Sequence, residues 1–401
     1  MTEATHIAGA APVVDMGELG AYADSHRLVD ARHEGDALIL TWDDHFQARF
    51  HRLWLRDHCA CPECRHPLTH ERVFSLLDVP ERLPRPGATV TEAGALRLVW
   101  PAMEGFSEHA SAFDPGWLRQ RAMAEIEPAD ARVETWDATI AEDLPRVEHR
   151  AFMQSDAGLR DWLDALVRYG FVMLGRGPVA ENEVVRIAER VGWPRETNFG
   201  RHFDVVSRPD PNNAAYTAIA LEPHVDLPNW RRPPDFQLLY CLENESEGGA
   251  SLLTDGFAVA EWLRSEDPDA FRLLSEQPLD FRFQDEGTDL SYRAPVIGLD
   301  STGALTEIRF NNWIRDSLRL PPQLVEPFYR AYRRFWEALR DPRFAIRFSL
   351  RPGQMIAFDN LRVLHGREAF DPSTGRRHLQ GAYLDRDLIH SRLRVLDRRA
   401  A

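Results

Sequence analysis

Three cysteines fall within six residues of this 401-residue chain, at Cys59, Cys61 and Cys64, and their spacing constrains the local fold more than any other feature. One tight turn presents three thiolates, which can fill three corners of the tetrahedron that Zn²⁺ requires. Four histidines are candidates for the fourth ligand, and spacing alone does not choose among them: His58, His66, His70 and His109. An iron–sulfur cluster and three unrelated reduced thiols are the alternatives.

Length and composition limit the class of protein. With 44% hydrophobic and 28% charged residues, the chain can bury a sizeable core and form two domains. No run of about 18 apolar residues occurs and no basic segment precedes an apolar one at the start, so we expect no membrane span, no signal peptide and a cytoplasmic protein. The net charge is −15 and every basic residue is arginine. Such a surface repels phosphate backbones and anionic lipid, so we expect neither nucleic acid nor membrane as a partner.

Apolar patterning divides the chain into four segments. Residues 1–35 show no clear periodicity and are expected to form a loosely ordered tail with at most a short strand. Short alternating runs at 37–42, 50–55 and 96–100, between Pro and Gly residues, predict a small β-rich module over 36–120. Residues 121–146 lack strong periodicity and are interpreted as a linker. The second domain is then 147–401.

The second domain is predicted to be rich in strands with supporting helices. Helical spacing of apolar residues predicts a helix over 157–169 and a longer one after Pro321-Pro322, whose apolar stripe runs from Leu324 to Leu339 ahead of Asp341-Pro342. Strand-like runs occur at 237–242, 344–350 and 355–359. Cys241 lies inside one of these runs and is interpreted as a core residue.

Two His-x-Asp triplets are candidate metal ligands, because residues i and i+2 of a strand share one face. They are His202-Phe203-Asp204 and His224-Val225-Asp226, and spacing cannot choose between them. A distant histidine, for which His365 is the candidate, would complete a two-histidine, one-carboxylate set that leaves three positions of Fe(II) open. Arg377 follows twelve residues later, and its guanidinium group can bind one carboxylate of a dicarboxylate through two parallel hydrogen bonds.

A series of motifs extends these observations along the chain. They are Trp54-Leu55-Arg56-Asp57 ahead of the cysteines, His109-Ala110-Ser111-Ala112-Phe113, Asn212-Asn213-Ala214-Ala215-Tyr216-Thr217, Asn311-Asn312, Phe358-Asp359-Asn360, His365-Gly366-Arg367, and Arg377-His378-Leu379 with Gly381-Ala382-Tyr383. In these motifs the chain resembles, over about residues 36–395, the γ-butyrobetaine/trimethyllysine dioxygenases, a branch of the taurine dioxygenase-like Fe(II)/2-oxoglutarate enzymes.

The resemblance implies a fold and a set of ligands. It implies a mainly β protein with flanking helices, whose catalytic domain is a double-stranded β-helix (jelly roll) preceded by a small zinc-binding β-rich domain. Iron would be bound by His224, Asp226 and His365, and 2-oxoglutarate by Arg377. Zinc would be bound by Cys59, Cys61, Cys64 and His109. The resemblance further implies a homodimer, O₂ as co-reactant and ascorbate as a supporting reductant.

The implied reaction is hydroxylation of a small trimethylammonium acid, with γ-butyrobetaine as first choice and 2-oxoglutarate converted to succinate and CO₂. Ring faces stabilise a cation that cannot donate hydrogen bonds. The family positions that would contact the substrate are Phe199, Phe203, Asn213, Tyr216, Asn312 and Tyr383. Leu227 departs from the aromatic residue expected after Asp226, and Trp230 and Trp313 can compensate. Trimethyllysine, a trimethylammonium phosphonate or another small metabolite are the alternative substrates, and an inactive zinc-organised assembly protein is the alternative of another class.

Overall fold

The computed structural model describes residues 13–19, 22, 26–123, 133–206 and 217–400. The chain forms two compact units, which we describe separately: the N-terminal unit, residues 1–131 with 397–401, and the C-terminal unit, residues 132–396. Among the described residues, no helix is both long enough and apolar enough to cross a membrane.

The N-terminal unit contains two three-stranded antiparallel sheets. The first comprises β1 (Leu28–Glu34), β2 (Ala37–Trp42) and β3 (Gln47–His51), and the second β4 (Gly87–Val90), β5 (Leu96–Trp100) and β6 (His109–Phe113). Alternate residues of β2 and β5 form the core between them, as a period of two requires: Leu38, Leu40, Trp42, Leu96, Leu98 and Trp100. Short helices complete the unit: α1 (Arg52–Asp57), η1 (Leu76–Asp78) and α2 (Pro115–Met123).

Strand β1 lies within residues 1–35, where we expected a loosely ordered tail with at most a short strand, and its largely exposed, charged residues show little alternation. One local expectation for the N-terminal unit needs correction. The apolar run 50–55 is not one strand, since β3 ends at His51 and helix α1 begins at Arg52. The His51 ring caps that helix by accepting a hydrogen bond from the Leu53 N–H, and histidine is not among the usual cap residues that signal a helix start.

The C-terminal unit is built on two sheets. The larger has the order β7-β8-β19-β11-β22-β9, with β7 (Arg146–Glu148), β8 (Phe171–Gly175), β9 (His202–Val205), β11 (Phe236–Asn244), β19 (Met355–Asp359) and β22 (Arg377–Leu384). The smaller has the order β10-β20-β13-β18, with β10 (Leu221–His224), β13 (Ser251–Asp255), β18 (Ala345–Phe348) and β20 (Val363–Arg367). Three two-stranded pairs supplement them: β12 (Glu247–Gly248) with β21 (Phe370–Asp371), β14 (Leu279–Gln284) with β15 (Asp289–Ala294), and β16 (Ile297–Leu299) with β17 (Leu305–Ile308).

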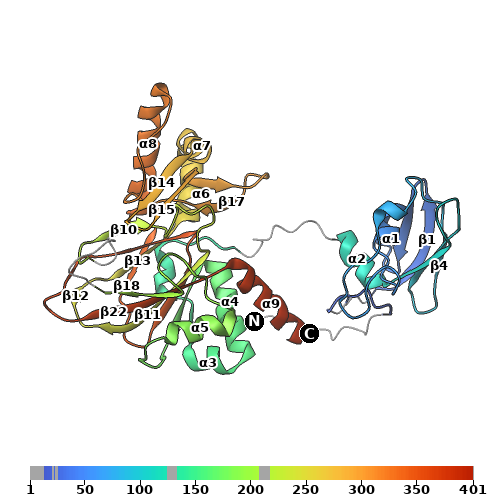
Figure 1. The fold of residues 1–401 in the computed structure, drawn as a ribbon, viewed down its shortest axis with the longest axis horizontal. Coiled ribbons are helices and arrows are strands. Elements are labelled where there is room, and N and C mark those ends of the chain that lie inside the picture. Colours follow the sequence, from blue (N-terminus) through green and yellow to red (C-terminus); the bar gives the residue numbers. More distant parts are fainter. Residues whose placement is uncertain (1–12, 20–21, 23–25, 124–132, 207–216, 401) are drawn as a thin grey trace. The chain divides into compact units, whose positions relative to one another are not determined.

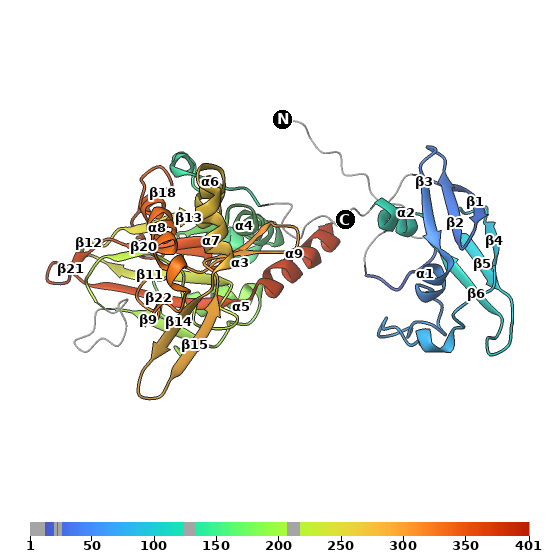
Figure 2. The same ribbon diagram turned by 90° about the horizontal axis from the view of Figure 1, so that it is seen from above.

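Helices cover the C-terminal unit on opposite sides (Figure 1). One group packs its apolar residues against the six-stranded sheet: α4 (Asp156–Tyr169), α5 (Glu183–Val191) and α9 (Arg386–Ala400), with α3 (His149–Gln154) beside α4. The other group is α6 (Gly256–Glu266), α7 (Pro268–Glu276) and α8 (Pro322–Leu339), which share a core with Val225 and Leu364 next to the smaller sheet. The 3-10 helix η2 (Ala138–Glu142) precedes β7. The β14–β15 hairpin projects from the unit (Figure 2).

The helix predicted over 157–169 agrees with α4 to within a residue, and the apolar stripe from Leu324 to Leu339 lies in α8. Helix α4 begins where the Ser155 hydroxyl accepts a hydrogen bond from the Gly158 N–H, and it ends at Gly170, whose φ of +72° is the left-handed conformation that glycine tolerates. Its buried stripe is the apolar stripe of the sequence: Leu159, Trp162, Leu163, Leu166 and Val167.

A buried ion pair joins β13 to the segment before β20. Arg362 and Asp255 have side chains 1% and 0% exposed, and their guanidinium and carboxylate form two hydrogen bonds of 3.1 and 2.7 Å. Arg362 also donates to the carbonyls of Glu134 and Arg168, and Asp255 accepts from the Trp136 N–H. These hydrogen bonds compensate for the burial of the two charged groups. Removal of either side chain would leave the other as an unpaired buried charge.

Candidate metal and cosubstrate site

Two histidines meet across the smaller sheet. His224 is the last residue of β10 and pairs directly with His365 of the neighbouring strand β20, so that their ring centroids lie 4.2 Å apart. The Nδ1 atom of His224 is 2.8 Å from the carbonyl oxygen of Glu222. A proton on Nδ1 that binds this carbonyl leaves Nε2 as the lone-pair donor, which is the arrangement typical of metal-binding histidines.

Asp226 completes the group from a turn. We expected His224 and Asp226 to share one strand face, but β10 ends at His224, and Leu227 has a φ of +55° that turns the chain. Atom Oδ1 of Asp226 lies 3.5 Å from Nε2 of His224 and 3.7 Å from Nε2 of His365. The three side chains are 23% exposed or less, so the structure brings together one carboxylate and two imidazoles in a largely buried site.

The turn that carries Asp226 is held by two buried side chains whose role the sequence did not reveal. Asn360, fully buried, accepts a hydrogen bond from the Asp226 N–H (2.7 Å) and donates to the Asp226 carbonyl (3.0 Å) and the Pro234 carbonyl (2.9 Å). Arg309 donates to the carbonyls of Pro228, Trp230 and Arg231. These bonds fix the left-handed turn, which a β-branched or bulky residue does not adopt by itself.

The electrostatics suit a divalent cation. Burial raises the pKa of Asp226, but the neighbouring imidazoles of His365 and His224 and a hydrogen bond from Tyr383 outweigh it and hold the pKa well below its usual range. Burial, followed by the charge of His224, lowers the pKa of His365 to about 3. An ionised Asp226 carboxylate and a neutral His365 imidazole therefore coexist at pH 7, and one carboxylate with two imidazoles is a donor set that fits Fe(II) with open positions.

The other His-x-Asp triplet has different surroundings. His202 and Asp204 lie on β9, and Oδ1 of Asp204 accepts hydrogen bonds from His378 (2.8 Å) and Gln380 (3.0 Å). Among the described residues, three groups of His, Cys, Asp or Glu lie close enough to share an ion, and neither His202 nor Asp204 belongs to any of them.

Arg377 lies beside a second buried arginine that we did not assign to the site. The guanidinium carbons of Arg367, on β20, and Arg377, on β22, lie 4.7 and 5.6 Å from the ring centroid of Phe370. Burial lowers the pKa of each to about 10, and for Arg367 the charge of Arg377 adds to the effect. Atom Nε of Arg377 is buried and has no hydrogen-bond partner among the described residues. Two adjacent cations, with Arg367 buried and Arg377 half-buried, favour an anionic ligand, and Arg367 is only two residues beyond His365.

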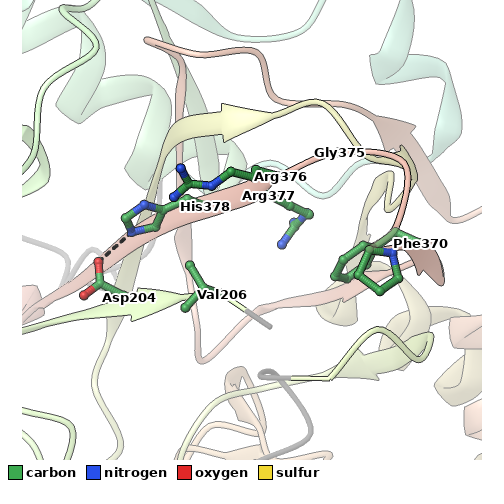
Figure 3. Close-up of a pocket in the computed structure, with 8 residues that line it drawn as sticks. Asp204, Val206, Phe370, Gly375, Arg376, Arg377 and His378 are labelled. Carbon is green, nitrogen blue, oxygen red and sulfur yellow. Dashed lines mark hydrogen bonds and ion pairs between the residues drawn. The ribbon is translucent and has the colours of Figure 1, made fainter. Parts of the chain in front are cut away.

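A cavity of about 600 Å³ opens beside Arg377. Figure 3 shows Arg377 and Val206 facing this space, with the Asp204–His378 pair on one side and Phe370 on the other. The volume is in the range of small-molecule sites, so the cavity is large enough for a dicarboxylate.

Aromatic rings extend from the metal site to the β14–β15 hairpin. The ring of Tyr383 lies 5.2 Å from Phe203, which lies 6.2 Å from Phe199, which in turn lies 6.3 Å from Phe283. We call these four residues the aromatic cluster. Phe283 was missed, because it alternates with buried Phe281 in β14 and so resembles an ordinary strand residue in the sequence. Trp313 approaches from another direction, with its ring 5.7 Å from that of His224.

The structure describes only some of the other residues that we assigned to the substrate site. Asn213 and Tyr216 lie outside the described residues. Asn312 is half-buried next to Trp313. Leu227 is buried in the turn after Asp226, and Trp230 lies 5.7 Å from the guanidinium of Arg195 with its Nε1 buried.

The cysteine cluster forms in the N-terminal unit with His109 as its fourth member. Nε2 of His109, in β6, lies 3.3, 3.7 and 3.5 Å from the sulfur atoms of Cys59, Cys61 and Cys64. Zn–S and Zn–N bonds of about 2.3 and 2.0 Å in a tetrahedron imply sulfur–nitrogen edges of about 3.6 Å. The observed separations therefore fit a zinc ion at the centre.

The environment of the cysteine cluster favours metal binding. Hydrogen bonding by Cys64 lowers the pKa of Cys59 to about 4, whereas the same contact, followed by burial, raises the pKa of Cys64. Thiolates this close repel one another unless a divalent cation lies between them. Buried Arg56 donates to the Cys64 sulfur at 3.2 Å, and Oε2 of Glu63 lies 3.5 Å from Nδ1 of His109, where it can orient the ring.

Comparisons with known proteins add the following. Residues 133–383 match the taurine catabolism dioxygenase TauD, TfdA family, and residues 29–119 match the gamma-butyrobetaine hydroxylase-like N-terminal family. A gamma-butyrobetaine dioxygenase from Pseudomonas sp. (strain AK-1) is 42% identical over 92% of this chain and 96% of its own. The human trimethyllysine dioxygenase is 32% identical over 90% of this chain and 88% of its own. The structure of a taurine dioxygenase from Burkholderia xenovorans has 18% identity and a TM-score of 0.45, covering 60% of this chain and 88% of that chain.

Proposed function

Since this chain belongs to the taurine catabolism dioxygenase TauD, TfdA family, we propose that it hydroxylates γ-butyrobetaine to carnitine, with Fe(II) as cofactor and 2-oxoglutarate and O₂ as cosubstrates. The observation that carries the choice of substrate is the 42% identity, over nearly the whole of both chains, to a protein named gamma-butyrobetaine dioxygenase. Relatives named trimethyllysine dioxygenase make that amino acid the second candidate.

The proposed iron ligands are His224, Asp226 and His365. Their three donor atoms lie within 4.8 Å of one another and form the two-histidine, one-carboxylate set. Bound there, iron supplies oxidative decarboxylation of 2-oxoglutarate to succinate and CO₂ and transfer of one oxygen atom to a C–H bond. Asn360 holds the main chain of Asp226, the Glu222 carbonyl orients the ring of His224, and the surroundings keep the Asp226 carboxylate ionised.

The proposed 2-oxoglutarate site centres on Arg377. Its guanidinium is buried, lies beside a second cation at Arg367, and faces a cavity of suitable size. A carboxylate bound to this fork would relieve the repulsion between the two guanidinium groups, and charge-assisted hydrogen bonds are the strong ones. The other end of the cosubstrate would then reach toward His365, which shares strand β20 with Arg367.

The proposed cation site is the aromatic cluster with Phe199, Phe203 and Tyr383 as its ring faces. A trimethylammonium group has no hydrogen to donate, and ring faces attract it through their quadrupoles. Asn312 is proposed as a polar neighbour of the substrate. Family resemblance assigns the same role to Asn213 and adds Tyr216 to the ring faces. The presence of all three metal ligands together counts against an inactive assembly protein.

The other parts of the proposal rest on family resemblance. We assign a structural zinc ion to Cys59, Cys61, Cys64 and His109, whose closed set of four ligands leaves no position for substrate. We also propose that the protein is a cytoplasmic homodimer and that ascorbate supports turnover. Light scattering of the purified full chain at micromolar concentration tests the dimer, since a monomeric mass of 45.9 kDa would contradict it.

The decisive experiment is a coupled product assay on the purified full chain with Fe(II), 2-oxoglutarate and ascorbate. Succinate and hydroxylated product are measured together for γ-butyrobetaine, trimethyllysine and a trimethylammonium phosphonate. We expect carnitine and succinate in a ratio near one with γ-butyrobetaine. Succinate without hydroxylated product, or coupled turnover of another substrate alone, would contradict this choice of substrate.

Two variants identify the iron ligands in the same assay. His365→Ala is expected to abolish succinate formation, whereas His202→Ala, in the other His-x-Asp triplet, retains it. Loss of activity in both variants, or in neither, would contradict the assignment of His365.

A further inference from the structure

The two oxygens of the Asp226 carboxylate have different partners. Oδ1 lies 3.5 and 3.7 Å from the Nε2 atoms of His224 and His365. Oδ2 accepts a hydrogen bond of 2.7 Å from the hydroxyl of Tyr383, a side chain only 2% exposed. The phenol therefore binds the oxygen that is not directed at the two imidazoles.

The different roles of the two carboxylate oxygens matter for a metal ion with six coordination positions. Two imidazoles and one carboxylate oxygen leave three positions open, whereas a carboxylate that binds through both oxygens leaves two. A cosubstrate that chelates through two atoms then leaves no position for O₂. A carboxylate can rotate about its terminal torsion at little cost, since that torsion is broad. A hydrogen bond to Oδ2 is what opposes the rotation.

The ring of Tyr383 is also held in place, by packing against Phe203. It lies on β22 and contacts the Phe203 ring at a centroid separation of 5.2 Å. Gly381, two residues earlier on the same face of β22, provides the space for Phe203, because a Cβ atom at this position would collide with the ring of Phe203. One side chain thus contacts both the aromatic cluster and the carboxylate of Asp226.

We propose that Tyr383 is a positioning residue which, through its hydroxyl, restricts Asp226 to one metal-facing oxygen while its ring forms part of the cation site. The inference rests on the proposed iron site and deepens it. Two functions follow from one residue and are separable. Tyr383→Phe removes the hydroxyl and keeps the ring, so it affects metal coordination and leaves the affinity for a trimethylammonium ligand nearly unchanged.

The test is a Co(II) titration of the full chain with its zinc retained, followed through the visible d–d absorption, which reports coordination number. Hydrogen-bond partners of metal ligands are typically worth about 10- to 100-fold in affinity. We therefore expect Tyr383→Phe to change Co(II) affinity by about tenfold or more and to alter the shape of the d–d spectrum. Tyr240→Phe is the matched control, because it removes another buried tyrosine hydroxyl, which donates to the Pro178 carbonyl away from the site.

A second measurement addresses coupling and folding. With Fe(II), Tyr383→Phe is expected to form several succinates per hydroxylated product, with the KM for γ-butyrobetaine within about threefold of wild type. Thermal unfolding by circular dichroism is compared with Tyr240→Phe, and the titration is run well below both midpoints. A Co(II) affinity, d–d spectrum and coupling ratio equal to wild type would overturn the proposal.

Asp226→Ala separates failure of this inference from failure of the iron site. If this variant loses the d–d signal while Tyr383→Phe resembles wild type, the iron site stands and the positioning role is wrong. If Asp226→Ala binds Co(II) as wild type does, the proposed iron site itself fails.

Discussion

The side-chain amide of Asn360 binds the main chain of Asp226 on both sides of the residue, accepting from its N–H at 2.7 Å and donating to its carbonyl at 3.0 Å. Asn360 follows β19, and Asp226 follows β10, so the amide joins the ends of two strands from different sheets. The position of the proposed carboxylate ligand therefore depends on a residue that never contacts the metal.

Asn360→Asp is expected to weaken both folding and metal binding. The new carboxylate keeps the bond from the Asp226 N–H but leaves the carbonyls of Asp226 and Pro234 without a donor. Buried unsatisfied groups cost about 1–3 kcal/mol each, so we expect the free energy of unfolding to fall by about 2–6 kcal/mol, with iron affinity at least about tenfold lower. Urea unfolding and iron titration measure the two effects.

Asn244→Ala is the control for Asn360, since Asn244 makes a single hydrogen bond to the Leu350 carbonyl. It should lower stability less and leave iron affinity unchanged. An Asn360→Asp protein with wild-type iron affinity would contradict the positioning role.

Arg377→Gln is expected to raise the KM for 2-oxoglutarate by about 10- to 100-fold. Hydrogen bonds to charged groups are worth about 1.5–3 kcal/mol, and 1.4 kcal/mol is a factor of ten. Arg330→Gln is the control, because this arginine of α8 is 74% exposed, pairs with Glu326 and does not line the cavity. Steady-state kinetics with varied 2-oxoglutarate decide the point, and equal KM values for the two variants would contradict the assignment of Arg377.

Regular patterns in the sequence predicted much of the fold. Helices α4 and α8 and strands β2, β5 and β19 appear where the apolar residues placed them: α4, α8 and β5 each bury one periodic face, whereas β2 and β19 are short apolar runs buried almost throughout. The fold class and reaction class, which came from family resemblance, are confirmed by the family match. The bounds of strand β1 were not predicted, because an edge strand with charged residues shows little alternation.

The geometry of the site was less accessible from sequence. The pairing of His224 with His365 depends on strand register, and that register includes an irregularity between Leu221 and His224. The roles of Asn360, Arg367 and Phe283 arise from contacts between elements far apart in the chain, and no spacing rule signals such contacts. The roles of the individual site residues stay predictions.

Asp204→Asn should distinguish the two His-x-Asp triplets. His378 and Gln380 outweigh the effect of burial and hold the pKa of Asp204 below its ordinary 3.8. A carboxylate with a lowered pKa in the folded protein stabilises it above the unfolded-state pKa, and this stability is lost as pH falls through the folded-state pKa. We expect wild type to lose stability below about pH 4 more steeply than the variant.

The size of the Asp204 effect is limited by solvent. The side chain is 43% exposed, so the loss at pH 7 should stay below about 1 kcal/mol. Iron binding should be retained in Asp204→Asn and abolished in Asp226→Ala. Loss of iron from Asp204→Asn would support the alternative triplet.

The Arg362–Asp255 pair predicts a large effect on stability. Asp255→Asn leaves a buried guanidinium without its counter-charge, and breaking such pairs costs about 3–5 kcal/mol. Arg272→Gln, which removes an exposed helical pair with Glu276, should cause no measurable change. Chemical denaturation compares them, and a shift below about 1 kcal/mol for Asp255→Asn would contradict this account of the core.

Zinc content tests the cysteine cluster independently of catalysis. Wild type should retain about one zinc per chain after dialysis against a weak chelator, because four ligands close the coordination shell. Cys64→Ser removes a thiolate whose sulfur lies 3.5 Å from Nε2 of His109, and should lose most of this zinc while the iron site still binds Co(II). Cys241→Ala, at a buried cysteine in β11 of the C-terminal unit, should retain zinc.

Because metal binding adds directly to folding free energy, Cys64→Ser should also unfold at a lower temperature. Zinc retained in full by Cys64→Ser, measured by atomic emission, would show that the four residues do not form the site.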